Sequence, residues 1–259
     1  MDPGNIVHFG TGLGTIHQVS IRNMDEQHRD FVSAQKARAV ATDVAVIAIV
    51  AGDGLEEVFT SLGVTAIIQG GQTMNPSAKD ILQKVEQSSM DKVIVLPNNK
   101  NIVLTANQIK PLTQKTVEII PTKTIPQGVA ALLAFDYDAD LETNINLMKQ
   151  SIENIKTIEV TRAVRSTQIG GLKIKKKQII SLLDNELTAV GDDTAEVIMD
   201  TLDKIDLEKN EIVTLYYGMD ITRAEGEKVA AAIRDKYPKL QVEIVRGDQP
   251  NYHYIISVE

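Results

Sequence analysis

From about residue 41 onward, short runs of β-branched residues alternate with amphipathic stretches, and this alternation constrains the fold more than any other feature. Val44 to Val50 is the first such run and is predicted to be a strand. Strands that alternate with helices form βαβ units around a mostly parallel sheet. The sequence therefore predicts an α/β fold.

The chain is expected to form two lobes. Its 259 residues, 43% of them hydrophobic, suffice for a core but reach the length at which chains divide into domains. A mostly parallel, Rossmann-like first lobe is predicted for residues 41–135 and a mixed-sheet second lobe for residues 136–259. Residues 1–40 do not follow the alternation and are predicted to form a hairpin plus a helix, the tail of a preceding domain.

Several pairs of residues indicate where helices start. Asp53 with Glu56, Asp193 with Glu196, and Thr222 with Glu225 each have the spacing of a capping box. Pro76 is expected in the first turn of a helix over residues 78–87, where proline is tolerated.

Composition excludes several classes of function. The net charge is −8 and the longest basic block is Lys175 to Lys177, so no nucleic-acid partner is expected. The absence of cysteine excludes disulfides, thiolate zinc sites and cysteine nucleophiles. The longest apolar runs are too short for a membrane helix, and the first residues do not resemble a signal peptide. We therefore expect a cytoplasmic protein without an integral membrane segment.

Catalytic motifs are absent from the sequence. There is no Ser-His-Asp order, no H-E-x-x-H helix and no phosphate loop. His8, His17 and His28 are too far apart for a local metal motif, and His253 alternates with tyrosines in a predicted strand. The sequence thus predicts no catalytic residue and no metal site.

The turn from Gly70 to Ser77 is the best candidate for a ligand site. Gly70 and Gly71 end a predicted strand, and the next helix would offer free backbone N–H groups that favour an anion. Further donors would come from the turn's polar side chains, which are Gln72, Thr73, Asn75 and Ser77. The alternative is that Asn75 or Ser77 caps the helix and the glycines only turn the chain.

Two further groups of polar residues are candidates for the same crevice. Asn98 and Asn99 follow the next strand, although asparagines also favour turns without any function. Arg162 and Arg165 stand three apart on one predicted strand, so they would point to opposite faces and only one could reach an anion. A solvated or ion-paired strand edge is the alternative.

Six segments together resemble one protein family, the large ATP-binding component of bacterial fatty acid kinase, which is dihydroxyacetone kinase-like. The resemblance covers essentially the whole chain and is most specific at Gly70 to Ser77 and Leu96 to Asn101. The other segments are Asn23 to His28, Ala51 to Leu55, Thr161 to Arg165, and Gly247 to Pro250 followed by Tyr254 to Val258.

The resemblance implies a C-terminal region made of the end of a middle domain and all of the last domain. In the family, ATP and magnesium are held by aspartates of an N-terminal domain, so no cofactor is expected in this chain. The resemblance also implies a DegV-like fatty-acid-binding protein as partner and a homodimer formed through the middle domain.

The last domain of this family is similar in architecture to DegV-like proteins, which hold an acyl carboxylate with a Thr/Ser turn and a Ser-Gly loop. Thr73 and Ser77 lie in an equivalent-looking turn, but Asn98 and Asn99 stand where the Ser-Gly loop would be. The leading hypothesis is a non-catalytic docking module that recognises the fatty-acid-binding partner. Binding of a fatty acid or other anion in the crevice is the alternative, and kinase activity of the chain itself is a third possibility.

Overall fold

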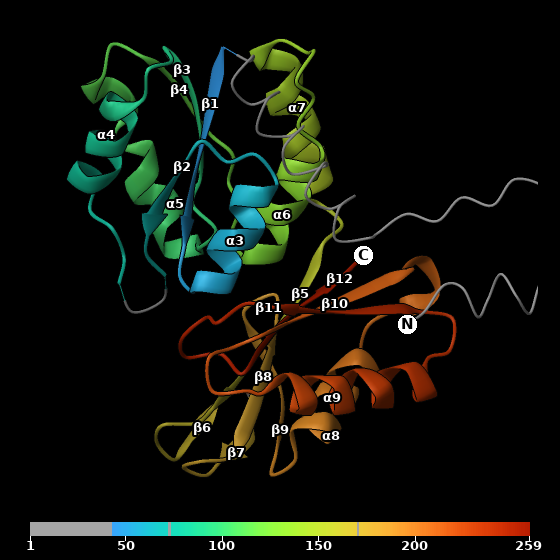
Figure 1. Ribbon diagram of the computed structural model, residues 1–259. Coiled ribbons are helices and arrows are strands. Elements are labelled where there is room, and N and C mark those ends of the chain that lie inside the picture. Colours follow the sequence, from blue (N-terminus) through green and yellow to red (C-terminus); the bar gives the residue numbers. More distant parts are fainter. Residues whose placement is uncertain (1–42, 72–73, 170) are drawn as a thin grey trace, which may run out of the picture.

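Two sheets with flanking helices form the body of the protein (Figure 1). The computed structural model describes residues 43–71, 74–169 and 171–259. The expected hairpin and helix before residue 41, with His8, His17 and His28, lie outside the described residues. The α/β class, with one parallel and one mixed sheet, is confirmed.

The first sheet is entirely parallel and has the strand order β2-β1-β3-β4. Its strands are β1 (Val44–Val50), β2 (Ala66–Gln69), β3 (Lys92–Leu96) and β4 (Thr116–Ile119). The helices of this part of the chain are α3 (Asp53–Ser61), α4 (Ala78–Gln87), α5 (Lys100–Asn107), the 3-10 helix η1 (Lys110–Leu112), α6 (Ile125–Leu133) and α7 (Leu141–Ser151).

Strand β1 is buried on both of its faces, which accounts for its unbroken apolar sequence. Side chains of successive strand residues point to opposite faces of the sheet. Val44, Val46 and Val50 pack with α3, α6 and α7, whereas Ile47 and Ile49 pack with α4 and α5. Helix α7 lies beyond the expected lobe boundary at residue 136 and still shares the core of the first sheet. The boundary itself stays a prediction.

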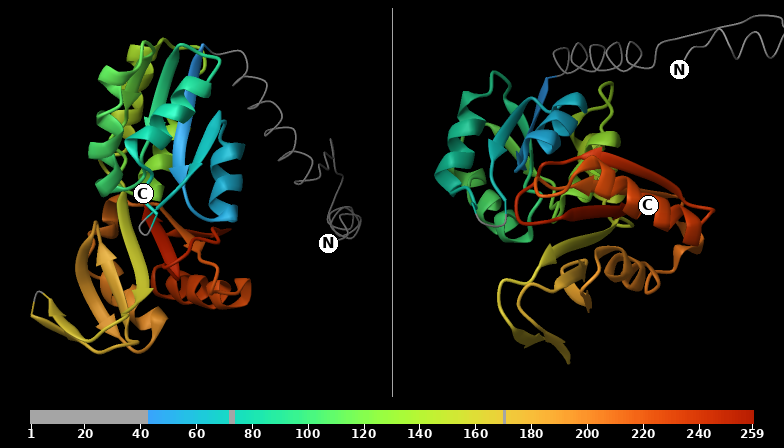
Figure 2. Two further views of the ribbon diagram at one scale, coloured as in Figure 1. Left: turned by 90° about the vertical axis from the view of Figure 1, so that its left-hand side faces the viewer. Right: turned by 60° about the horizontal axis from the view of Figure 1, so that its bottom comes forward.

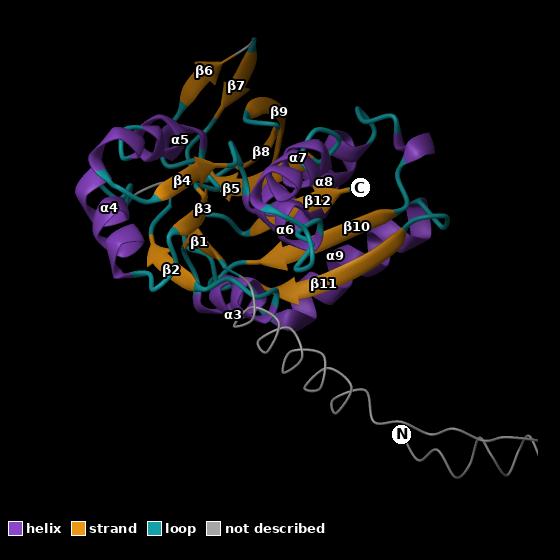
Figure 3. Cartoon of the chain, turned by 90° about the horizontal axis from the view of Figure 1, so that it is seen from above, coloured by secondary structure: helices purple, strands orange, loops and turns teal. Residues whose placement is uncertain are grey.

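The second sheet is mixed and has the order β11-β10-β12-β5-β8-β9 (Figure 3). Its strands are β5 (Lys156–Arg162), β8 (Ile179–Leu183), β9 (Glu186–Gly191), β10 (Ile212–Tyr217), β11 (Gln241–Arg246) and β12 (Tyr254–Val258). Helices α8 (Thr194–Leu202) and α9 (Arg223–Lys236) cover one face, and a 3-10 helix, η2 (Leu207–Lys209), lies between α8 and β10. A separate two-stranded ribbon consists of β6 (Thr167–Ile169) and β7 (Leu172–Ile174).

Two of the three expected helix starts are confirmed. Thr222 and Glu225 form a reciprocal capping box at α9, and Asp193 accepts a hydrogen bond from the Glu196 backbone at α8. The third prediction was wrong, because Gly52, with φ of 114°, is the N-cap of α3 and no side chain caps that helix.

Three other local predictions also need correction. Pro76 precedes the N-cap of α4 and does not lie in its first turn. Helix α6 begins at Ile125, because Thr124 caps it and Pro126 fits its first turn. Strand β5 ends at Arg162, so Arg165 lies outside it and the two arginines do not share a strand.

The two sheets share one apolar core. Tyr216 on β10 and Ile255 on β12 belong to the same buried cluster as Val46 of β1 and Leu55 of α3. Their strand neighbours, including Leu215 and Ile256, face α8 and α9 instead. The second sheet therefore has helices on one face and the first lobe on the other (Figure 2).

Close backbone packing completes the contact between the lobes. The turn from β1 to α3 meets the loop that follows β11, and the Leu55 backbone N–H donates to the Gly247 carbonyl at 2.9 Å. A Cβ atom on Gly54 would lie 2.3 Å from the Arg246 carbonyl oxygen. Glycine is therefore required here because the two backbones approach so closely. We call this contact, Gly52–Leu55 against Arg246–Gln249, the lobe seam.

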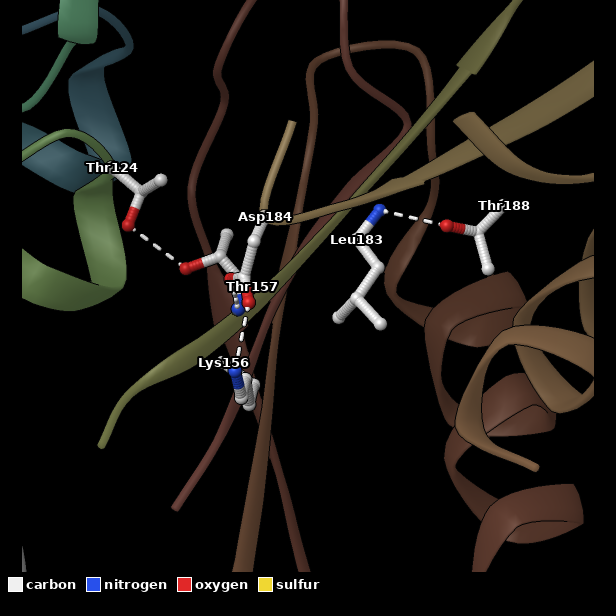
Figure 4. Close-up of polar contacts among 6 residues, drawn as sticks. All are labelled: Thr124, Lys156, Thr157, Leu183, Asp184 and Thr188. Atoms are coloured by element: carbon white, nitrogen blue, oxygen red, sulfur yellow. Dashed lines mark hydrogen bonds and ion pairs between the residues drawn. The ribbon is translucent and has the colours of Figure 1, made fainter. Parts of the chain in front are cut away.

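A buried hydroxyl pair joins the lobes at a second point (Figure 4). The Thr124 hydroxyl at the start of α6 lies 2.8 Å from the Thr157 hydroxyl on β5. The Thr157 backbone N–H donates to the Asp184 carboxylate, which also forms an ion pair with Lys156. The order of the lobes is thus held by polar as well as apolar contacts.

We expect Gly54→Ala to lower the free energy of unfolding by at least about 2 kcal/mol, because the added methyl group forces two backbones apart. Chemical denaturation would measure the change. Glu57→Ala, on the exposed side of the same helix, should stay within about 0.5 kcal/mol of the parent chain. Equal stability of the Gly54 and Glu57 variants would contradict the close approach at the seam.

Candidate functional site

A crevice lies at the carboxyl ends of the parallel strands β1, β2 and β3, where ligands bind in open α/β sheets. The second lobe closes it with the end of β5, the loop before β12 and β12 itself. The described lining residues are Ile49, Ala51, Leu55, Gly70, Gly71, Met74, Pro97, Asn98, Asn99, Ile125, Glu159, Gln249, Pro250, Asn251, Tyr252 and Ile255.

The free space in this crevice is small. The described residues leave about 90 Å³ for water-sized molecules. Sites for drug-sized ligands usually offer about 300–1,000 Å³. Core side chains such as Leu55 and Ile255, both in the shared cluster, occupy the space that a long acyl chain would need.

The candidate residues of the Gly70 to Ser77 turn do not all reach the crevice. Gly70 and Gly71 line it, whereas Asn75 and Ser77 are exposed and are not among its described lining residues. Gln72 and Thr73 lie outside the described residues. A Cβ atom on Gly70 would lie 2.8 Å from Pro76 Cδ, so this glycine permits a tight turn.

The N-terminus of α4 already holds a carboxylate of its own chain. Ser77 is the N-cap, and its hydroxyl and backbone N–H donate to Asp80 Oδ2 at 2.7 and 2.9 Å. These hydrogen bonds lower the pKa of the Asp80 carboxyl. Because Asp80 satisfies the donors at which an anionic ligand was expected, this geometry favours the capping alternative.

Asn98 ties three strand ends together. It is buried, its backbone has φ of 53°, and its Nδ2 donates to the Ile49 carbonyl at 3.1 Å. Its backbone N–H donates to the Thr122 hydroxyl, which follows β4. Asn98 Oδ1 has no hydrogen-bond partner among the described residues and lies against Gly128 of α6. These contacts link β1, β3 and the chain after β4.

Asn99 and Arg162 have simpler surroundings. Asn99 is the N-cap of α5, and its side chain accepts a hydrogen bond from the Asn101 backbone at 2.9 Å. Arg162 is exposed at the end of β5 and does not belong to the described lining of the crevice. A ligand-binding role for the candidate residues, Gly70, Gly71, Gln72, Thr73, Asn75, Ser77, Asn98, Asn99 and Arg162, stays a prediction.

Two crevice residues that the sequence reasoning missed give this space its electrostatic character. Glu159 is 7% exposed, and burial raises the pKa of its carboxyl, although a hydrogen bond from Tyr252 and the charge of Lys100 act in the opposite direction. Gln249 donates through Nε2 to the Tyr216 carbonyl at 2.7 Å, while its Oε1 has no partner among the described residues. An acidic residue inside an apolar strand was the available signal for Glu159.

The described lining residues therefore present acceptors rather than cations. They contribute a carboxyl and two unpaired amide oxygens, and none of them is lysine, arginine or histidine. A fatty-acid carboxylate needs donors or positive charge. In the described parts of the chain, no group of three or more His, Asp or Glu residues can hold a metal ion. The described helices include none that is long and apolar enough to cross a bilayer.

This geometry defines a two-lobed α/β protein of the DegV type. The DegV family protein Cg2579 from Corynebacterium glutamicum has a similar structure, with a TM-score of 0.60, 13% identity, and coverage of 84% of this chain and 96% of that one. The fatty acid kinase B3 protein of Streptococcus pneumoniae, solved with linoleic acid, matches with a TM-score of 0.53, 8% identity, and coverage of 83% and 99%. Dihydroxyacetone kinase from C. freundii, solved with AMP-PNP and Mg²⁺, matches at 0.56 with 13% identity over 94% of this chain and 57% of that one.

The chain belongs to the FakA-like C-terminal family of fatty acid kinase, whose model matches residues 45–259. An uncharacterized protein of Staphylococcus aureus strain USA300 is 38% identical over 261 residues, which cover 99% of this chain. The same alignment covers 48% of the relative, so the chain spans about half the length of the curated relatives it matches.

Replacing Asn98 with alanine should destabilise the fold by about 2–3 kcal/mol. The change leaves the buried Ile49 carbonyl without its donor and places a Cβ in a left-handed backbone. Urea unfolding would measure the loss, and the exposed Asn101→Ala should change stability by less than about 0.5 kcal/mol. Full stability of Asn98→Ala would show that the contact does not hold the strand ends together.

Glu159→Gln should become progressively more stable than the parent chain as the pH rises from 4 to 8. A raised pKa in the folded state means that the neutral carboxyl stabilises the fold below its ordinary value of 4.5, and this contribution is lost as the pH rises through the folded-state value. Unfolding curves across this pH range test the trend. A stability difference independent of pH, as expected for the exposed Glu153→Gln, would contradict it.

Proposed function

We propose that this region is a non-catalytic docking module of a fatty acid kinase, which recognises a DegV-like fatty-acid-binding partner and presents its acyl group to a kinase domain. The single observation behind this proposal is a DegV-type fold whose crevice is filled and acceptor-lined. The module then works through its outer surface. Family membership supplies the connection with fatty acid kinase.

Two features of the crevice favour docking over the alternative of fatty-acid binding by this chain. The free volume is about 90 Å³, well below what an acyl chain fills. The described lining offers Glu159 and two amide oxygens where a carboxylate would need donors. The S. pneumoniae protein solved with linoleic acid shares the fold at 8% identity, so the common architecture does not carry its ligand to this chain.

We also propose that ATP and magnesium bind to a part of the full-length protein outside this chain. The support is that the curated relatives are about twice as long as the aligned region. Dihydroxyacetone kinase, which was solved with AMP-PNP and Mg²⁺, is likewise matched over only 57% of its length. The phosphoryl transfer itself is thereby assigned to another domain.

Calorimetric titration of this chain with the DegV-like protein of the same organism, loaded with oleate, tests the docking function. We expect saturable binding with a Kd of about 10 μM or tighter, which is typical of a transient but specific complex. An absence of binding heat at several times that concentration, together with no change in sedimentation, would contradict docking.

The same instrument separates docking from ligand binding. Oleate titrated into this chain alone should give no saturable heat, while the loaded partner should. Saturable binding of free oleate by the chain alone would instead support the alternative of a fatty-acid site in the crevice. Turnover of ATP by this chain, with partner and fatty acid supplied, would contradict a non-catalytic role.

A further inference from the structure

The β6–β7 ribbon carries a charge opposite to that of the whole chain. Between residues 162 and 177 the sequence has six basic and no acidic residues, although the chain as a whole has a net charge of −8. In sequence these cations form two short groups, Arg162 with Arg165 and Lys173 with Lys175–Lys177. The fold joins the groups, because the Lys177 backbone N–H donates to the Ala163 carbonyl at 2.8 Å.

All six cations are available to a partner. Each is exposed, and none forms an ion pair with another described residue. The ribbon extends away from both sheets, as the second view of the molecule shows (Figure 2). Such a local excess of positive charge steers association with an acidic surface.

Aliphatic side chains accompany the charges. Ile169 pairs with Leu172 across the ribbon, and the two are 52% and 37% exposed. Val164, at the base of the ribbon, is 84% exposed. Because Ile174 on the same ribbon is buried against the body, the apolar face runs outward from the core into solvent. A ribbon of two three-residue strands has little stability of its own and gains from a surface that covers this face.

The composition favours a protein over a lipid surface as the occupant. Segments that lie in a membrane interface commonly anchor through Trp, Tyr or Phe, and residues 162–177 contain no aromatic residue. A bilayer is also an extended anionic plane that would meet the acidic remainder of the molecule. A protein can place its carboxylates opposite the ribbon alone, within the screening distance of about 8 Å.

We propose that this basic ribbon, Arg162, Arg165, Lys173 and Lys175–Lys177 with Val164, Ile169 and Leu172, is the docking surface for an acidic, partly apolar patch on the fatty-acid-binding partner. The inference rests on the proposed docking function and adds where, and by what chemistry, docking occurs. It gives the exposed Arg162 a role outside the crevice.

The test compares two triple charge reversals in the calorimetric titration with the oleate-loaded partner. K175E/K176E/K177E should weaken binding at least about tenfold, because three attractive contacts become repulsive. The matched control, K79E/K123E/K149E, removes the same charge from exposed lysines elsewhere and should change the Kd less than about threefold. A further variant, I169S/L172S, should weaken binding without changing its salt dependence.

Every outcome discriminates. Circular dichroism and thermal melts first show that each variant is folded. Equal weakening by both triple variants, or none by either, would overturn the ribbon while the docking function stands. No binding by the parent chain would overturn both proposals. If the parent chain bound phosphatidylglycerol vesicles through the ribbon, while partner affinity stayed unchanged in K175E/K176E/K177E, a lipid surface would replace the protein as occupant.

Discussion

The apolar core that the two sheets share is the contact on which the rest of the structure depends. Strand β1 is buried on both faces, and one of these faces belongs to the same cluster as Tyr216 and Ile255 of the second sheet. The lobe seam adds a backbone approach that admits no side chain at Gly54. Opening the lobes would expose this cluster and break the seam, so the closed arrangement follows from packing.

The closed arrangement decides what the crevice can do. Ligand sites in open α/β sheets lie at the carboxyl ends of the strands, and here the second lobe occupies that position. The polar groups near it are used within the fold: Asp80 takes the α4 N-terminus, Asn99 caps α5, and Asn98 joins strand ends. What remains is a small, acceptor-lined space. Function is therefore more readily placed on the exterior, where the ribbon carries unpaired charge.

Much of the fold could be predicted from the sequence, because local signals and packing agree. Strands β1, β3 and β10 and helix α4 begin and end where the apolar patterns do. Strand β9 and the ribbon strand β6 were not foreseen, since half-exposed strands lack a strong apolar signal. The capping box expected at Asp53 failed because tertiary contact at the seam, and not a local side chain, sets the start of α3. The site was less predictable, because Glu159 and Gln249 meet Asn98 only through the pairing of lobes far apart in sequence.

Hydrogen–deuterium exchange tests most directly the claim that this module acts through its exterior and not through its crevice. The chain would be compared alone, with oleate, and with the oleate-loaded partner. The account predicts that the partner slows exchange in residues 162–178, and that oleate alone leaves exchange unchanged at the crevice segments 68–71, 97–99 and 247–255. Protection of those crevice segments by oleate alone, with no protection of the ribbon by the partner, would contradict it.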